Sequence, residues 1–228
     1  MAAVEAGVDW VEVDVQRSVD DRLFVHHDAA LADGRPIGET PAPALARHGI
    51  LGVVDLLEAL PTHVGVVFDV KSTIHDAERQ ASATTAAVLA RTCNRHLGDR
   101  RAVAMSFDPS ALAHMRDTAP ELPLGLLTWI RFPIGHAVAA ATHLDVDVLA
   151  VHAGSMWRNT ESGLGNQPLI LDVVDRVHAS GRQLAVWRPS LRRARSLALA
   201  GVDAMIVDDV RRHLKSRPEP HRTTRRTP

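Results

Sequence analysis

Four charged residues at strand-like spacing carry the first chemical signal of this chain. Glu12 and Asp14 alternate with valines, and Asp69 and Lys71 alternate with a second set of apolar residues. Side chains of a β-strand point alternately to its two faces, so each segment is predicted to be a strand with one apolar and one charged face. Carboxylates and an ammonium on such faces offer ligands for a cation and a binding group for an anion.

Two interpretations of these charged faces are open. The first is a half-solvated antiparallel sheet with its polar face in water. The second is a barrel whose valine face packs on outer helices and whose acidic face lines a pocket. In such a pocket the three carboxylates would repel one another and lose hydration unless a cation lay among them.

The order of the remaining elements favours the barrel. After a first strand that begins near Val11, strands are predicted at 65–71, 102–107, 124–127, 148–151, 183–187 and 204–207. Helices are predicted between them, at 55–60, 76–97, 109–118, 135–144, 168–179 and 191–200. Strands that are separated by helical segments pair in parallel through right-handed crossovers.

The predicted fold is therefore an α/β barrel of the (β/α)₈ TIM type over residues 1–210, one strand short of eight. A doubly wound open sheet is the competing fold, but no strand is followed by a glycine-rich nucleotide loop. A short apolar run at 23–25 predicts a hairpin with the first strand. Chemistry in a barrel gathers where its strands end, and Asp14, Lys71, Phe107 and Trp187 all fall at such ends.

Composition and charge exclude several classes of protein. Of the 228 residues 46% are hydrophobic, and no apolar run approaches the roughly 20 residues that span a bilayer. The single cysteine, Cys93, excludes an internal disulfide, and without a signal peptide at the start we expect a cytoplasmic protein. Residues 211–228, with seven Lys or Arg and one acid, are predicted to form a basic disordered tail. The acidic remainder argues against a nucleic-acid-binding domain.

The ligand types indicate which metal and which substrate would suit the pocket. Three carboxylates without cysteine partners favour Mg²⁺ or Ca²⁺ over zinc. Lys71 should face the same cavity as Asp69, and a metal and a lysine in one cavity indicate a phosphate-bearing substrate. His27, in the hairpin, could act as a general acid or base, or could be an ordinary polar residue of that hairpin.

Taken in order, these residues resemble the glycerophosphodiester phosphodiesterase family from Ala2 to about Val210. The motifs that carry the resemblance are Glu-x-Asp at 12–14, His-Asp at 27–28, Asp-x-Lys at 69–71, Ser-Phe at 106–107, Ala-Val-Trp at 185–187 and the final strand at 201–208. The resemblance implies a (β/α)₈ barrel that hydrolyses a small-molecule glycerophosphodiester to glycerol 3-phosphate and an alcohol, a reaction of lipid and glycerol metabolism.

The resemblance also implies a role for each candidate site residue. Glu12, Asp14 and Asp69 would hold the divalent cation, and Lys71 would contact the phosphodiester. His27 would be one of two catalytic histidines on a hairpin above the barrel mouth. The substrate entrance would be lined by Phe107 and Trp187.

The chain departs from the family pattern in three places. The family opens with a strand ending in His-Arg-Gly, which carries the second catalytic histidine, and that motif does not occur here. We therefore expect Met1 to be an internal methionine of a longer protein, or residues 1–228 to be a truncated chain with little hydrolytic activity. Asp69 stands where the family has glutamate, which shortens its reach by on the order of 1.5 Å. Arg188-Pro-Ser stands where the family has Thr-Val-Asn.

Other functions stay open on these residues alone. A truncated or degenerate barrel that binds phosphodiesters or a partner without catalysis is favoured by the departures. An enolising barrel enzyme fits less well, because such enzymes spread their metal ligands over three strands, whereas Glu12 and Asp14 share one. His152, at the end of a predicted strand, could join any of these sites.

Overall fold

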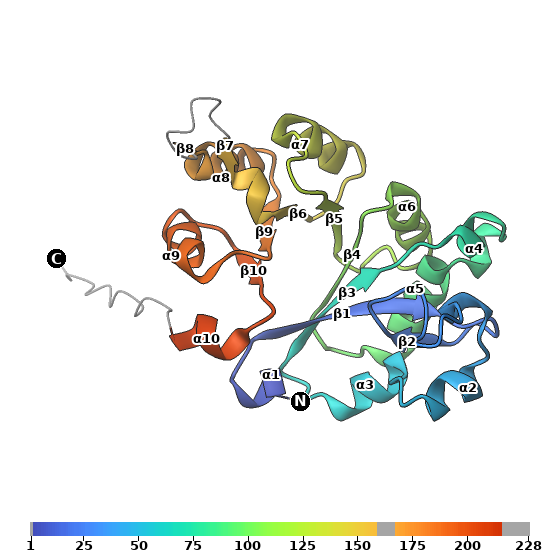
Figure 1. The fold of residues 1–228 in the computed structure, drawn as a ribbon. Helices are drawn as coiled ribbons and strands as arrows, with labels where there is room; N and C mark the ends of the chain where they lie inside the picture. The colour runs from blue at the N-terminus through green and yellow to red at the C-terminus, as the bar shows by residue number, and fades with distance from the viewer. Residues whose placement is uncertain (1, 159–166, 216–228) are drawn as a thin grey trace.

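The computed structural model describes residues 2–158 and 167–215, and its frame is one curled sheet with helices along its outer side (Figure 1). The sheet has eight strands in the spatial order β10-β9-β6-β5-β4-β3-β1-β2. Their bounds are β1 Trp10–Arg17, β2 Leu23–Val25, β3 Gly65–Val70, β4 Ala102–Ser106, β5 Leu124–Thr128, β6 Val148–His152, β9 Gln183–Trp187 and β10 Ala204–Ile206. A separate short pair is formed by β7 Trp157–Arg158 and β8 Gln167–Pro168.

Helices connect most of the strands. They are α1 Ala2–Glu5, α2 Ala42–Arg47, α3 Val53–Ala59, α4 Ile74–Ala77, α5 Thr85–His96, α6 Pro109–Thr118, α7 Ile134–His143, α8 Ile170–Ala179, α9 Leu191–Leu199 and α10 Val210–Lys215. Three short 3-10 turns complete the elements, at η1 Ile37–Glu39, η2 Ala81–Ala83 and η3 Ala153–Met156. Within the described residues, no helix is long and apolar enough to cross a membrane.

The pairing of the strands confirms the predicted topology. Within the eight-stranded sheet, seven of the described strands run in parallel, and β2 is antiparallel to the end of β1. The parallel series ends at β1 on one side and at β10 on the other, and these two strands are not paired with each other in the part of the chain that the structure describes. The sheet is thus a barrel-like curl that is open between β1 and β10.

The two faces of the sheet bury different sets of side chains. On the outer face, Val66, Phe68 and Val70 are at most 2% exposed and pack in one core with side chains of the helices. The inner face carries a second, smaller apolar cluster, which includes Met105 and Ala185. Full burial of a valine or phenylalanine contributes about 1.5–3 kcal/mol, so the outer face holds the strands in register. The predicted alternation of side chains between the two faces of these strands is confirmed.

The boundary between β3 and α5 differs from the prediction. A helix over 76–97 was expected, but only α5 forms a long helix, after α4 and η2. The carboxylate of Asp76 accepts the backbone N–H groups of Thr73 at 3.4 Å and Thr85 at 2.9 Å, and it pairs with Arg17 at 3.3 Å. These side-chain bonds replace the helical ones, and Thr84 then caps α5 by accepting from the Ala87 N–H.

The other predicted boundaries lie within a few residues of the observed ones. The helix expected from 109 is confirmed, because the carboxylate of Asp108 accepts the Ser110 N–H at 2.8 Å and Pro109 occupies the first turn. The prediction of a disordered tail from 211 was wrong for residues 211–215, which belong to α10. The rest of that predicted tail, 216–228, lies outside the described residues.

Candidate active site

The predicted carboxylates meet where β1 and β3 end. Asp14 and Asp69 are directly paired in the parallel register of these strands, and Glu12 lies two residues earlier on the same face of β1. One carboxylate oxygen from each of the three residues can be chosen so that all lie within 4.8 Å of one another. Adjacent parallel strands place paired side chains close together on one face, so the cluster follows directly from the register.

Lys71 joins this cluster from the first position after β3. Its Nζ lies 2.7 Å from Asp14 Oδ1 and 2.5 Å from Asp69 Oδ2. Its backbone N–H donates to the Val15 carbonyl at 3.0 Å, which holds the residue against β1. The structure therefore brings Glu12, Asp14, Asp69 and Lys71 together.

The electrostatics of the cluster leave a place for a cation. Burial, followed by the charges of Asp14 and Asp69, raises the pKa of Glu12 from 4.5 to about 7. Burial also raises the pKa of Asp69. Asp69 Oδ1 is buried and has no hydrogen-bond partner among the described residues, which is costly for a carboxylate oxygen. Three carboxylates share one ammonium, so a divalent cation with oxygen ligands fits the donor set.

His27 lies on the loop after β2, near the carboxylates. The His26 N–H donates to the Asp14 carbonyl at 3.0 Å, so the loop begins at the end of β1. The His27 side chain is exposed, and its Nδ1 is 2.8 Å from Asp28 Oδ1. The hydrogen bond to Asp28, together with the negative charge of Asp14, raises the pKa of the imidazole above its ordinary value.

An aromatic wall, formed by Phe107, Trp129, His152 and Trp187, lies at the ends of β4, β5, β6 and β9. Phe107 stacks on Trp129 with 4.1 Å between ring centroids and meets the edge of Trp187 at 5.9 Å. Trp187 in turn meets His152 at 4.4 Å. The contact between Phe107 and Trp187 joins strands that are three places apart in the sheet, so the rings span its concave side.

Trp129 is the member of the wall that sequence reasoning missed. Trp129 is the first residue after β5, as Phe107 is the first residue after β4. This shared position at a strand end could have indicated Trp129 from the sequence. Its side chain is 61% exposed although one ring face is stacked. Trp129 therefore offers free aromatic surface at the same rim as the charged cluster.

His152 has a defined hydrogen-bonding pattern within the wall. Its Nδ1 accepts the Gly154 N–H at 2.8 Å, which leaves the proton of the neutral ring on Nε2. Burial, with the nearby charge of Arg188, lowers the pKa of the imidazole. Arg188 itself is exposed and has a positive φ of 53°. His152 is thus a neutral donor near pH 7.

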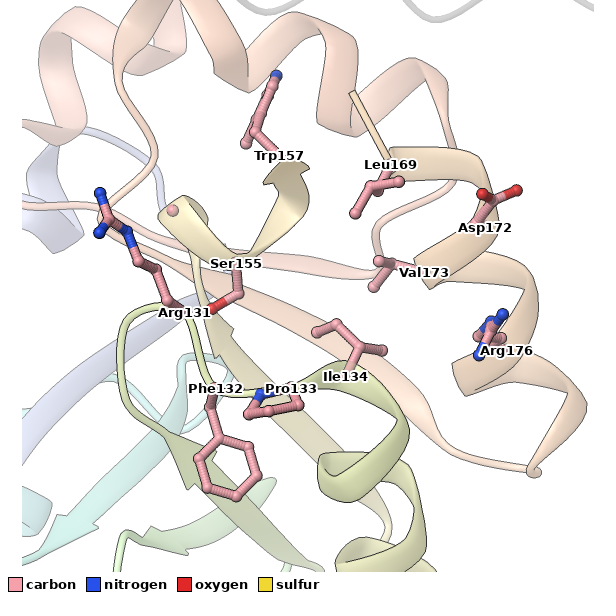
Figure 2. Close-up of a pocket in the computed structure, with 11 residues that line it drawn as sticks. Arg131, Phe132, Pro133, Ile134, Ser155, Trp157, Leu169, Asp172, Val173 and Arg176 are labelled. Atoms are coloured by element: carbon pink, nitrogen blue, oxygen red, sulfur yellow. The ribbon is translucent and has the colours of Figure 1, made fainter. Parts of the chain in front are cut away.

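A separate pocket lies beyond the loop that carries Trp129. It has a volume of about 390 Å³ and is bounded by the loop before α7, by η3 and by the start of α8 (Figure 2). Arg131, Trp157 and Asp172 are among its lining residues. None of the four charged residues of the cluster lines it, so the candidate chemistry lies outside this pocket.

The fold and the charged cluster together are those of a phosphodiesterase-type barrel, and comparison with known families agrees. The model of the glycerophosphoryl diester phosphodiesterase family matches residues 1–212. The chain therefore belongs to this family, as its motifs indicated. No curated protein sequence matches the chain.

Solved structures of phosphodiesterases share the fold at low sequence identity. A phosphodiesterase from Oleispira antarctica, in complex with the product sn-glycerol-3-phosphate, is 21% identical with a TM-score of 0.74, over 93% of this chain and 86% of that one. A glycerophosphodiester phosphodiesterase from Thermotoga maritima is 19% identical with a TM-score of 0.72, over 95% and 88% of the two chains. One from Agrobacterium tumefaciens is 19% identical with a TM-score of 0.69, over 93% and 89%.

Proposed function

We propose that this chain carries the active site of a divalent-cation-dependent hydrolase of glycerophosphodiesters, with glycerol 3-phosphate and an alcohol as products. The observation that carries the proposal is the cluster of three carboxylates and Lys71 at the rim of a barrel of this family. Overall, one water is consumed: its oxygen ends on phosphorus, the bond from phosphorus to the alcohol oxygen breaks, and that oxygen gains a proton.

Glu12, Asp14 and Asp69 are the residues that would hold the cation. The unpartnered Asp69 Oδ1 and the raised pKa of Glu12 both support this assignment, because a cation would satisfy the first and favour ionisation of the second. Oxygen ligands suit Mg²⁺ or Ca²⁺. When bound, such an ion supplies a Lewis acid that stabilises negative charge on the phosphoryl oxygens.

Lys71 would bind the phosphodiester anion. Its Nζ is already at the cluster, 2.7 Å from Asp14 Oδ1, so a small rotation of the flexible side chain redirects the ammonium toward a bound phosphate. An ammonium near the phosphoryl oxygens stabilises charge that develops in the transition state.

His27 would exchange protons with the reacting oxygens. It is exposed on the loop beside the cluster, and Asp28 orients its ring through Nδ1. The other ring nitrogen, Nε2, would then be the atom that exchanges the proton with the substrate. A pKa held above the ordinary value keeps more of the ring protonated near neutral pH, which suits a general acid at the leaving alcohol.

The aromatic wall would line the substrate entrance. Phe107 and Trp187 were predicted for this role, and Trp129 and His152 extend the same surface. Such a surface packs against the carbon skeleton of the glycerol or of the alcohol group.

A barrel that binds phosphodiesters without hydrolysing them is the second candidate. The observation in its favour is the open side of the sheet between β1 and β10, together with the shorter Asp69 in place of glutamate. The two candidates differ in turnover and not in the ligand they bind.

The test is release of glycerol 3-phosphate from a glycerophosphodiester with Mg²⁺ or Ca²⁺ present, and again after chelation. We expect release that stops on chelation and falls by about a hundredfold or more in Asp14→Asn. The matched control is Asp175→Asn, which changes an exposed aspartate on α8 and should leave the rate unchanged. Release that persists in Asp14→Asn would contradict the proposal.

A further inference from the structure

One buried amide beside the charged cluster makes an unusual set of hydrogen bonds. Gln16 follows Asp14 by two positions in β1 and is 2% exposed. Its Nε2 donates to three successive carbonyl oxygens, those of His26 at 3.0 Å, His27 at 3.2 Å and Asp28 at 2.5 Å. A carboxamide nitrogen has only two hydrogens, so the three carbonyls share them and converge on one point.

These three carbonyls lie just beyond the paired part of β2. The β1–β2 register begins at Val15 opposite Val25, and the next residue adds one backbone bond, from the His26 N–H to the Asp14 carbonyl. Beyond that bond, the loop is hydrogen-bonded to β1 through the side chain of Gln16, in place of backbone pairing. The loop curls around this amide, and His27, whose carbonyl is the middle one of the three, has an exposed side chain.

We propose that Gln16 is a positioning residue for His27. Its amide determines the path of residues 26–28, and with it the point above the carboxylate cluster from which the imidazole extends. The catalytic part of this inference rests on the proposed function, because the role of His27 in hydrolysis belongs to that proposal.

The chemistry of the position explains why glutamine suits it. A leucine or methionine has no donor, so three carbonyls at a buried position would lose their partner. A glutamate would place a negative charge against three carbonyl oxygens. An asparagine keeps the amide but is one methylene shorter, so it reaches fewer of the three oxygens.

The first readout follows His27 directly and needs no catalysis. The charged groups that act on His27 are Asp28, Asp14 and Lys71, together with Glu12 and Asp69 of the same cluster. His26 is its neighbour along the chain and also interacts with Asp28. We would titrate the histidine ring protons by NMR in the wild type and in Gln16→Met. Release of the loop should move the His27 pKa toward its ordinary value and leave that of His152 unchanged.

The second readout is a double-mutant cycle on turnover, with Gln16→Met, His27→Ala and the double variant. If Gln16 acts through His27, Gln16→Met lowers kcat by roughly tenfold or more and KM changes little, because misplaced acid–base groups lose part of their contribution. The double variant should then be no slower than His27→Ala alone. Gln16→Asn should fall between Gln16→Met and the wild type.

Controls separate positioning from folding and from the proposed function. Gln183→Met changes an exposed glutamine at the start of β9 and should affect neither readout. An unchanged His27 titration in Gln16→Met overturns the inference, and so does a double variant whose loss is the product of the two single losses. If Gln16→Met does not fold, the His27 titration is read in Gln16→Asn. If the wild type shows no turnover, the proposed function fails while the titration still decides the role of Gln16.

Discussion

The Lys71 ammonium lies 2.7 Å from the Asp14 carboxylate, at the centre of the group of side chains that would hold a cation. Burial disfavours the charged form of Lys71, but its hydrogen bonds to Asp14 and Asp69 outweigh burial and raise its pKa. The lysine therefore compensates part of the negative charge of the cluster. A cation that binds there must share these carboxylates with the ammonium or displace it.

Removal of the Lys71 charge should strengthen cation binding while it abolishes turnover. A unit charge at about 4 Å contributes about 1 kcal/mol even in water, so Lys71→Met should bind Ca²⁺ about fivefold more tightly or better. Isothermal titration calorimetry measures the affinity. Lys215→Met, at the only other lysine of the chain, is the matched control. Equal or weaker binding in Lys71→Met would show that the ammonium does not compete with the cation.

The acidic cluster should make the chelated protein less stable as pH rises. The pKa of Glu12 is about 7 in the folded protein and 4.5 as its ordinary value, so the folded state holds more protons between these limits. The free energy of unfolding therefore falls as pH rises from about 4.5 to about 7. Thermal melts in chelator across this range measure the slope.

Glu12→Gln should reduce that slope, and saturating Ca²⁺ should abolish it, because a bound cation keeps the carboxylate ionised in the folded state as well. The control is Glu58→Gln, an exposed glutamate on α3, which should melt with the slope of the wild type. If the pH dependence of stability is the same in Glu12→Gln as in the wild type, a group other than Glu12 takes up the proton.

Truncation of Trp129 should weaken substrate binding without harming the fold. Its side chain is 61% exposed and its main ring contact is with Phe107, a kind of pair that is worth about 0.5–1.5 kcal/mol. We expect Trp129→Ala to raise KM by roughly threefold or more at nearly constant kcat. Steady-state kinetics test this, with Leu171→Ala, 65% exposed on α8, as the control. A wild-type KM in Trp129→Ala would show that Trp129 does not contact the substrate at the entrance.

Loss of Asp76 should destabilise the protein strongly. Arg17 has a side chain that is 2% exposed, and it pairs with Asp76 and with the more exposed Asp21. Because a buried charge then loses a partner and the start of α5 loses two hydrogen bonds, Asp76→Ala should lower the free energy of unfolding by about 3 kcal/mol. Urea denaturation measures the difference against Asp117→Ala, an exposed aspartate on α6. A loss below about 1 kcal/mol would mean that Asp21 alone satisfies Arg17.

Local patterns predicted the parts of this molecule that depend on neighbours along the chain. Alternation of Val66, Phe68 and Val70 with Asp69 marked both faces of β3, and Asp108-Pro109 marked the start of α6. The family motifs then indicated the carboxylates of the cluster. Each of these signals is contained in a few consecutive residues.

Features that depend on distant side chains were not predictable in the same way. The break between α4 and α5 depends on bonds from Asp76 to Arg17, 59 residues away. The stack of Trp129 on Phe107 depends on the neighbouring ends of β4 and β5. The hydrogen bonds of the Gln16 amide depend on the path of the loop around it. No residue type in that loop predicts this path.

Hydrolysis can be followed directly by a phosphorus-31 NMR time course on the purified protein with a glycerophosphodiester and Mg²⁺ or Ca²⁺. We expect the phosphodiester resonance to be replaced by that of glycerol 3-phosphate. Chelator should stop the conversion, and Asp14→Asn should not convert the substrate. A diester resonance that broadens on binding but never converts, with either cation, would contradict hydrolysis and favour the non-catalytic barrel.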